Sequence, residues 1–374
     1  MRGRLFPEGR FMRFLSRANP YHSGPVSDHF DGRRFFNPDG HGPGGLGALL
    51  RWRFKHKRAQ WPDHFPGLPT DRPPARVSGG AARLSFVGHA SFLLQTGGLN
   101  ILLDPLWSER CSPFDNVGPK RRNAPGIAFD DLPAIDVVCV SHSHYDHMDA
   151  STLKRLHARF SPRFLTPLGN DALIRGFCPS AKVEAHDWLA RVPLNGDVAL
   201  TFEPTHHWGA RGVFDRSMTL WASFAFETPA GFIYYVGDSG FFGGANYRAA
   251  RQRHGPAKLA VLPIGAYAPR FFMAPQHQDP DEAVRAARFL EAELSIGSHW
   301  GTFQLTDEPI DEPPARLSAA LARWSVAPER FIAGRPGLAV SLPHAIDAPL
   351  PEPLAATPET TARAVHETGE EASD

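Results

Sequence analysis

The chain has 374 residues, 42% of them hydrophobic, and a formal net charge of +1 at pH 7. This length and composition predict a globular protein built on one large domain with appendages. The near-neutral charge gives no overall basic field, which argues against nucleic acid as a partner. Three cysteines without a C-x-x-C spacing argue against a disulfide framework and favour a reducing, cytoplasmic location.

The first 80 residues are rich in Gly, Pro and Arg, and we expect them to form an extension packed on the main domain. Two stretches, 2–17 and 46–58, interleave basic and apolar residues. Such stretches either keep their charges solvated or lie on an anionic membrane, so peripheral contact with the inner membrane surface is an open alternative. We find no apolar run of transmembrane length and no signal-peptide core.

From residue 83 onward, short apolar runs separated by glycine-containing turns predict β-strands. The expected strands cover 84–87, 92–95, 100–103, 135–140, 232–236 and 258–264. Helices alternate with them, and this alternation indicates a layered α/β domain over residues 81–343. Residues 344–374 are rich in Pro, Ala, Glu and Thr, and we expect them to be disordered.

Three helices are expected from their start signals and apolar periodicity. Asp149 is a candidate N-cap for a helix that reaches Phe160. The sequence Asp279-Pro280-Asp281-Glu282 combines a capping residue, an N1 proline and two acids, and predicts a helix running to about Leu294. A third helix is expected over 313–324.

The segment 141–147 reads Ser-His-Ser-His-Tyr-Asp-His and places four potential metal ligands within six residues, directly after an apolar strand. A zinc ion needs three or four protein donors plus water, so this cluster needs donors from other strand ends. A single histidine after a strand is more often an ordinary surface or core residue, and the cluster is what gives weight to the others. The candidates are His142, His144, Asp146 and His147 in the segment, and His207, Asp238 and His299 elsewhere.

These donors and several longer motifs resemble the metallo-β-lactamase-fold superfamily, and more closely N-acylphosphatidylethanolamine-hydrolysing phospholipase D and its bacterial relatives. The resemblance runs from about residue 83 to about residue 338. Its motifs are Gly88-His89-Ala90, Asp104-Pro105, Gly118-Pro119-Lys120-Arg121, Pro133-Ala134-Ile135-Asp136, His206-His207-Trp208, the octapeptide 263–270, Gln276-His277-x-Asp279-Pro280 and the hexapeptide 298–303.

The resemblance implies a four-layer αββα sandwich that carries two zinc ions. It assigns His142, His144 and His207 to the first zinc, assigns Asp146, His147 and His299 to the second, and makes Asp238 the bridge. Asp104 and His89 would support the ligands from behind, and Asp104 would orient ligand histidines. The sequence departs from the animal enzyme at His206, which replaces Gln, at Ser239, which replaces Thr, and throughout the first 80 residues.

The resemblance also implies the reaction, which is hydrolysis of N-acylphosphatidylethanolamine to an N-acylethanolamine and phosphatidic acid by a metal-bridging hydroxide. Asp146, Asp238 and His277 are the expected catalytic residues. Asp238 would take the proton of the attacking water, and His277 would stabilise the phosphate or assist the leaving group. Gln276 and His277 match a pair near the substrate phosphate.

Other functions remain open. A hydrolase of the same fold could act on a lactone, a cyclic nucleotide or a soluble phosphodiester. An iron redox protein is a further alternative, although flavo-diiron proteins carry Glu where His144 stands and persulfide dioxygenases keep the motif. A nuclease is disfavoured by the missing basic field, and a non-catalytic binding protein is disfavoured by the complete ligand set. The oligomeric state is open, with a homodimer among the alternatives.

Overall fold

Two mixed β-sheets form the centre of the molecule. The computed structural model describes residues 18–39, 42, 44–114, 116–343 and 345–346. The first sheet has the strand order β15-β14-β1-β2-β3-β4-β5-β6. In that order its strands are Ala345–Ile346, Ala339–Leu342, Ala82–Gly88, Ser91–Thr96, Leu99–Leu103, Val137–Cys139, Arg163–Pro167 and Lys182–His186.

The second sheet has the order β13-β12-β11-β10-β9-β8-β7. In that order its strands are Phe331–Ala333, Leu294–Ser298, Leu259–Pro263, Gly231–Tyr235, Ser223–Thr228, Ala199–Glu203 and Arg191–Pro193. Strands β10 to β13 run parallel to one another, and β7 to β10 pair antiparallel. The parallel part brings the carboxyl ends of β10, β11 and β12 to one edge of the sheet.

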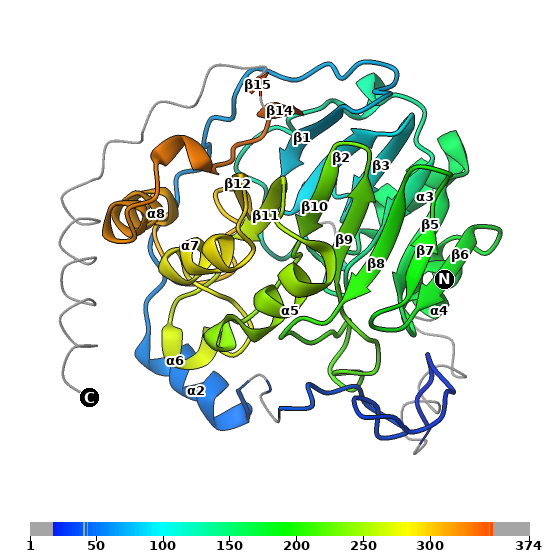
Figure 1. Ribbon diagram of the computed structural model, residues 1–374. Coiled ribbons are helices and arrows are strands. Elements are labelled where there is room, and N and C mark those ends of the chain that lie inside the picture. Colours follow the sequence, from blue (N-terminus) through cyan, green and yellow to red (C-terminus); the bar gives the residue numbers. More distant parts are fainter. Residues whose placement is uncertain (1–17, 40–41, 43, 115, 344, 347–374) are drawn as a thin grey trace.

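Helices cover the outer face of each sheet, so the molecule has the expected four αββα layers (Figure 1). Helices α3 (Ala150–Phe160) and α4 (Asn170–Phe177) pack on the first sheet through buried apolar side chains. Helices α5 (Ala245–His254), α7 (Pro280–Phe289) and α8 (Glu312–Arg323) pack on the second sheet. Between the sheets lies an apolar core that includes Phe86, Phe92, Phe202, Phe224 and Tyr235.

Two further helices, α2 (Leu46–Lys55) and the short α6 (Arg270–Met273), lie together at one corner of the molecule (Figure 1). Single 3-10 turns occur at Phe129–Asp131, Phe242–Gly244 and Pro328–Arg330. In the part of the chain that the structure describes, no helix is both long enough and apolar enough to cross a bilayer.

The predicted helix starts are confirmed, and one predicted helix end is wrong. The carboxylate of Asp149 accepts a hydrogen bond from Ser151 N at the start of α3, and Asp279 forms a capping box with Glu282 at the start of α7. Helix α7 ends at Phe289 instead of about Leu294. The reason is tertiary, because Leu294 pairs with Leu259 in the parallel β11–β12 ladder.

Residues 18–80 contact the main domain along much of their length. Asn19 Nδ2 donates to Met218 O at 2.8 Å, and Phe35 N donates to Ser217 O at 2.7 Å. The predicted basic stretch 2–17 and most of the predicted tail, 347–374, lie outside the described residues. Strand β15 falls inside the expected tail, so the sheet continues beyond residue 343. At the other boundary, Ala82 of β1 lies opposite Leu342 of β14.

Candidate metal centre

The predicted metal ligands gather at one edge of the sandwich, where four strands end. The segment 142–147 follows β4, His207 follows β8, Asp238 follows β10 and His299 follows β12. His299 has φ +64°, so the backbone turns sharply where the strand ends. The structure thereby brings together all seven predicted donors, although they lie between residues 142 and 299 of the sequence.

A first group consists of three histidines and one carboxylate. His144 Nδ1 lies 2.9 Å from His142 Nε2 and 3.1 Å from His207 Nε2. Asp238 Oδ2 lies 3.8 Å from His142 Nε2 and 3.6 Å from His207 Nε2. Since the donor atoms of these four side chains all lie within 4.8 Å of one another, one ion could contact all of them.

A second group lies beside the first and shares Asp238 with it. His299 Nε2 lies 3.1 Å from Asp146 Oδ2 and 3.3 Å from Asp238 Oδ1. His147 Nε2 lies 3.1 Å from Asp238 Oδ2. Asp238 Oδ2 therefore lies between the first group and His147, and Oδ1 faces His299. His89 also belongs here, because its Nε2 lies 3.0 Å from Asp146 Oδ2 and within ligand distance of the group.

Several atoms at the centre are buried without a hydrogen-bond partner among the described residues. They include His147 Nε2, Asp238 Oδ1 and His277 Nδ1. A buried polar atom without a partner is costly, and a metal ion would remove that cost. Imidazole nitrogens and carboxylate oxygens are also donors that zinc prefers. The residues present therefore fit a pair of divalent cations.

Burial keeps the histidines of the first group neutral. It lowers the pKa of His144 to about 3 and the pKa of His207 to about 4. For His142 the same cause holds the pKa well below its usual value. Neutral imidazole is the form that binds a metal, so these three side chains are ready to do so near neutral pH.

The second group has a different charge balance. Burial alone would lower the pKa of His299, but the neighbouring Asp238 and Asp146 carboxylates outweigh it and raise that pKa to about 9. The pKa of His147 is likewise raised well above its usual value, because Asp238, Asp146 and Asp104 outweigh burial. Protonation of these two histidines would neutralise the neighbouring carboxylates. A bound cation would take over that role.

Asp104 supports the ligands without facing either group. Its Oδ2 accepts hydrogen bonds from His147 Nδ1 at 2.6 Å and from the hydroxyl of Tyr235 at 2.6 Å. Its Oδ1 accepts from Ser141 N at 2.6 Å. The bond to Nδ1 leaves Nε2 of His147 directed at the carboxylates, which is how a supporting carboxylate fixes the tautomer of a ligand.

Gln276 and His277 lie at the side of the first group. The carbonyl of Gln276 accepts a hydrogen bond from His207 Nδ1 at 2.9 Å, and its side-chain oxygen accepts one from Trp208. His277 Nδ1 lies 4.0 Å from Asp238 Oδ2. The contact with His207 gives Gln276 a role in orienting a donor, while substrate contact by Gln276 and His277 stays a prediction.

Comparison with known proteins identifies the family. The β-lactamase superfamily domain matches residues 99–300, which is more than half of the chain. This chain belongs to the β-lactamase superfamily. Its domain is that of a metal-dependent hydrolase.

Two curated relatives of this superfamily member illustrate its range of neighbours. An uncharacterized protein of Mycobacterium tuberculosis is 38% identical over 248 residues, which are 65% of this chain and 65% of that protein. The chain thus spans about two thirds of the mycobacterial relative. The N-acyl-phosphatidylethanolamine-hydrolyzing phospholipase D 1 of Caenorhabditis elegans is 35% identical over 259 residues, 66% of this chain and 72% of that protein.

Among solved structures, isothiocyanate hydrolase from Delia radicum gut bacteria matches with a TM-score of 0.55 and 20% identity. The match covers 70% of this chain and all of that chain. At this identity the likeness concerns the fold alone, and it agrees with the αββα layers described above.

Sequence reasoning did not find two residues that support the centre of this superfamily member. Tyr235 is the last residue of β10, and its contact with Asp104 spans 131 positions. Asp39, in the extension, accepts a hydrogen bond from His206 Nε2, and Asn246 contacts the other ring nitrogen of His206. No local pattern marks either contact, because both join segments that meet only in the folded chain.

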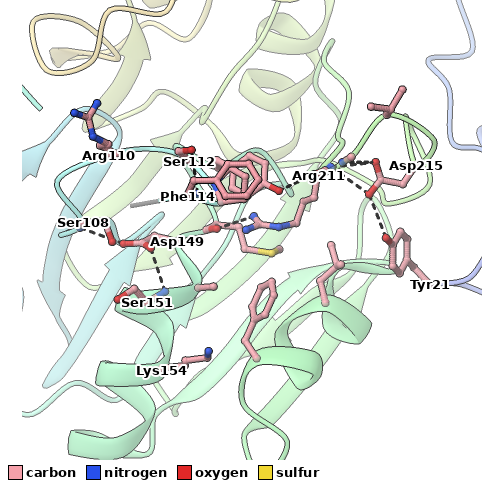
Figure 2. A pocket seen from close by; sticks show the side chains of 18 of the residues that line it. Tyr21, Ser108, Arg110, Ser112, Phe114, Asp149, Ser151, Lys154, Arg211 and Asp215 are labelled. Carbon is pink, nitrogen blue, oxygen red and sulfur yellow. Dashed lines mark hydrogen bonds between the residues drawn. The ribbon is translucent and has the colours of Figure 1, made fainter. Parts of the chain in front are cut away.

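A cavity of about 880 Å³ lies beside the segment 142–147 (Figure 2). Tyr145 and Met148 form part of its wall, together with Phe114, Phe177 and other apolar side chains. Figure 2 shows the Arg211 side chain extending across the cavity, and its Nη1 donates to the carbonyls of Ser143 and Met148.

Most of the aromatic residues close in sequence to the site loops are buried. Phe241 and Phe303 are buried in apolar clusters, and Phe272 and Met273 are also buried. Phe271 is partly exposed. None of these lines the cavity beside Tyr145, and most of the set therefore serves packing.

Proposed function

We propose that the protein is a zinc-dependent phosphodiesterase of phospholipase D type, which hydrolyses N-acylphosphatidylethanolamine to an N-acylethanolamine and phosphatidic acid. The observation that carries the chemistry is the position of Asp238, whose carboxylate lies within 4 Å of histidines from both donor groups. The resemblance of the chain to the C. elegans relative supports the choice of substrate.

In this proposal His142, His144 and His207 hold one zinc ion, Asp146, His147 and His299 hold the other, and Asp238 contacts both. When bound, such a pair of ions supplies a water of lowered pKa and neutralises charge on a phosphoryl group. His89 stands close enough to Asp146 and His299 to fix their orientation.

Asp238 and His277 carry the proposed proton chemistry. Nearby positive charges, chiefly His147, outweigh burial and hold the pKa of Asp238 well below its usual value, so its carboxylate is ionised. The ionised carboxylate is the form that can accept the proton of an attacking water, and its lowered pKa makes it a weak base. Burial lowers the pKa of His277, so its imidazole is neutral and can donate a hydrogen bond from Nδ1 to a phosphoryl oxygen.

The cavity beside Tyr145 gives the apolar part of the substrate a place to bind. Ligand sites typically measure about 300–1,000 Å³ and are mainly apolar with a few polar groups. This cavity falls in that range of volume. Its lining combines apolar side chains such as Phe114, Phe177 and Met148 with charged ones such as Lys154 and Arg211. Tyr145 stands between His144 and Asp146 in the chain, whereas none of the donor side chains lines the cavity. The use of this cavity for an acyl chain is therefore part of the proposal.

The proposed setting is the cytoplasmic side of a membrane. All three cysteines, Cys111, Cys139 and Cys178, are buried and unpaired, as a reducing compartment would allow. A phospholipid diester substrate requires access to a bilayer. The protein would act as a peripheral enzyme and needs no nucleic-acid partner.

The test is metal analysis of the purified protein combined with hydrolysis of N-acylphosphatidylethanolamine dispersed in detergent. We expect about two zinc ions per chain and release of phosphatidic acid, with loss of both in His144→Ala. His157→Ala, which changes a histidine that contacts Ser180 far from the centre, is the matched control. Release of diacylglycerol instead of phosphatidic acid would contradict the assignment of the broken bond. Hydrolysis of a lactone, a cyclic nucleotide or a soluble phosphodiester alone would leave the fold standing and overturn the substrate.

A further inference from the structure

The helix α2 and the residues after it form a basic segment on the outside of the molecule. Between Leu46 and Trp61 the chain has five basic residues and no acidic residue. These residues are Arg51, Arg53, Lys55, Lys57 and Arg58. The segment lies outside the region that matches the superfamily domain, residues 99–300.

One side of α2 is fixed to the protein. The indole N–H of Trp52 donates to Asp307 Oδ2 at 2.8 Å, and its ring centroid lies 5.1 Å from that of Phe272 on α6. The guanidinium of Arg51 lies 4.3 Å from the ring centroid of Phe271. These contacts set the rotation of the helix and decide which side chains point to solvent.

The side chains left outside are a mixture of apolar and cationic groups. Leu49, Leu50 and Phe54 are 43%, 47% and 81% exposed. Leu50 and Phe54 are four residues apart and so lie on one side of the helix. Arg53 and Lys55 form no ion pair within the described ranges. Apolar residues exposed together in this way typically mark an interaction surface.

We propose that the outer side of α2 docks on an anionic lipid surface. A bilayer interface offers both phosphate-bearing headgroups for cations and acyl boundary for Leu50 and Phe54, which neither a nucleic acid nor bulk water provides. The absence of acidic residues between Leu46 and Trp61 matches the negative charge of such a surface. The chemistry on the outer side of α2 therefore fits this one partner best.

The contact between α2 and α6 links this surface to the candidate metal centre. The carbonyl of Met273, the last residue of α6, accepts hydrogen bonds from the backbone of Gln276 and His277. The backbone carbonyl of Gln276 in turn accepts a hydrogen bond from Nδ1 of His207. A lipid layer resting on α2 would therefore lie near the loop that borders the donor groups. This step rests on the proposed function, whereas the docking surface itself does not.

The experiment is co-sedimentation of the full-length protein with vesicles, which requires no catalysis. We expect the protein to bind phosphatidylcholine:phosphatidylglycerol (7:3) vesicles. Its affinity for pure phosphatidylcholine vesicles should be lower by a factor of at least about ten. Salt at 0.5 M should weaken the binding, because it screens charge. The double variants Leu50→Ser/Phe54→Ser and Arg53→Ser/Lys57→Ser should each lose about tenfold in affinity.

Matched controls are Val26→Ser, an exposed apolar residue of the extension, and Lys182→Ser, an exposed cation on β6. Both should bind like the unchanged protein. Unaltered thermal unfolding and unaltered hydrolysis of detergent-dispersed substrate should accompany the α2 variants, since these side chains face solvent. Equal loss in the controls, equal binding to both vesicle types, or binding to an oligonucleotide but not to anionic vesicles would overturn the proposal. If hydrolysis fails while vesicle binding holds, only the proposed function falls.

Discussion

Asp39 of the N-terminal extension accepts a hydrogen bond from Nε2 of His206, the residue that directly precedes the predicted ligand His207. The extension thus reaches the candidate metal centre across 167 positions of sequence. At this position the sequence departs from the animal enzyme, which has Gln. One of the two side-chain partners of His206, Asp39, comes from the part of the chain that the superfamily domain does not match.

Replacing Asp39 should loosen the first donor group without removing a donor. In Asp39→Ala, His206 loses a charge-assisted partner, and the backbone at His207 becomes less fixed. We expect zinc affinity to fall by up to about tenfold, at the low end of the effect of residues that orient ligands. Competition with a coloured chelator measures this. Asp63→Ala, which removes an exposed partner of Arg122 in the same extension, should leave the affinity unchanged.

Replacing Asp238 should affect both donor groups at once. Asp238→Asn keeps the size of the side chain, removes its charge and replaces one oxygen by an NH2 group, so the side chain can no longer offset two cations. We expect fewer than two metal ions per chain and a loss of turnover of at least about 100-fold. Asp197→Asn, an exposed turn residue, is the control. If purified Asp238→Asn retained both metals and full activity, the bridging assignment would be wrong.

Two adjacent tyrosines permit a sharp test of Asp104. Tyr235→Phe removes one of the hydrogen bonds that hold this carboxylate, and we expect metal affinity to fall about tenfold. Tyr234→Phe removes a buried hydroxyl on the opposite face of the same strand and should lower stability without changing metal affinity. Metal titration followed by thermal unfolding separates the two effects. Equal metal affinity in both variants would argue against the supporting role of Asp104.

Stability should depend on pH through Glu203, which is buried at the end of β8. Its carboxylate accepts hydrogen bonds from Arg253 and His254, and these outweigh burial and lower its pKa. A carboxylate with a lowered pKa stabilises the fold above its ordinary pKa near 4.3 and loses that effect as pH falls through the lowered value.

Glu203→Gln should therefore destabilise the protein by about 2 kcal/mol at pH 7, because it breaks a buried ion pair with one partly exposed partner. The difference from the unchanged protein should shrink below about pH 4. Denaturant unfolding at both pH values measures it. Glu227→Gln, which breaks the exposed pair with Arg191, should cost less than about 1 kcal/mol.

The sequence was most informative where several potential metal ligands lie close together in one segment. The four donors between His142 and His147 required others from strand ends, and this requirement pointed to His207, Asp238 and His299. The structure brings all of them together, while their roles as ligands await metal analysis. The layers could be predicted because alternating strands and helices leave few other arrangements.

Other features depend on contacts between distant segments. The end of α7 could not be read from its periodicity, because pairing of Leu294 with β11 decides it. The contacts of Asp39 and Tyr235 also could not be predicted from local sequence. The cavity beside Tyr145 could not be predicted either, because its walls come from several separate loops. His89 Nε2 lies 3.0 Å from Asp146 Oδ2, and only the folded chain brings these two residues together.

The pairing of Ala82 with Leu342 places the two ends of the sandwich side by side. A short linker could join them, and new termini could be opened in the exposed turn at 195–197 between β7 and β8. Such a circular permutant would release the extension from its covalent position. Residues 18–80 could then be added back as a separate polypeptide. This would show whether the extension can bind and support the sandwich domain without a covalent link.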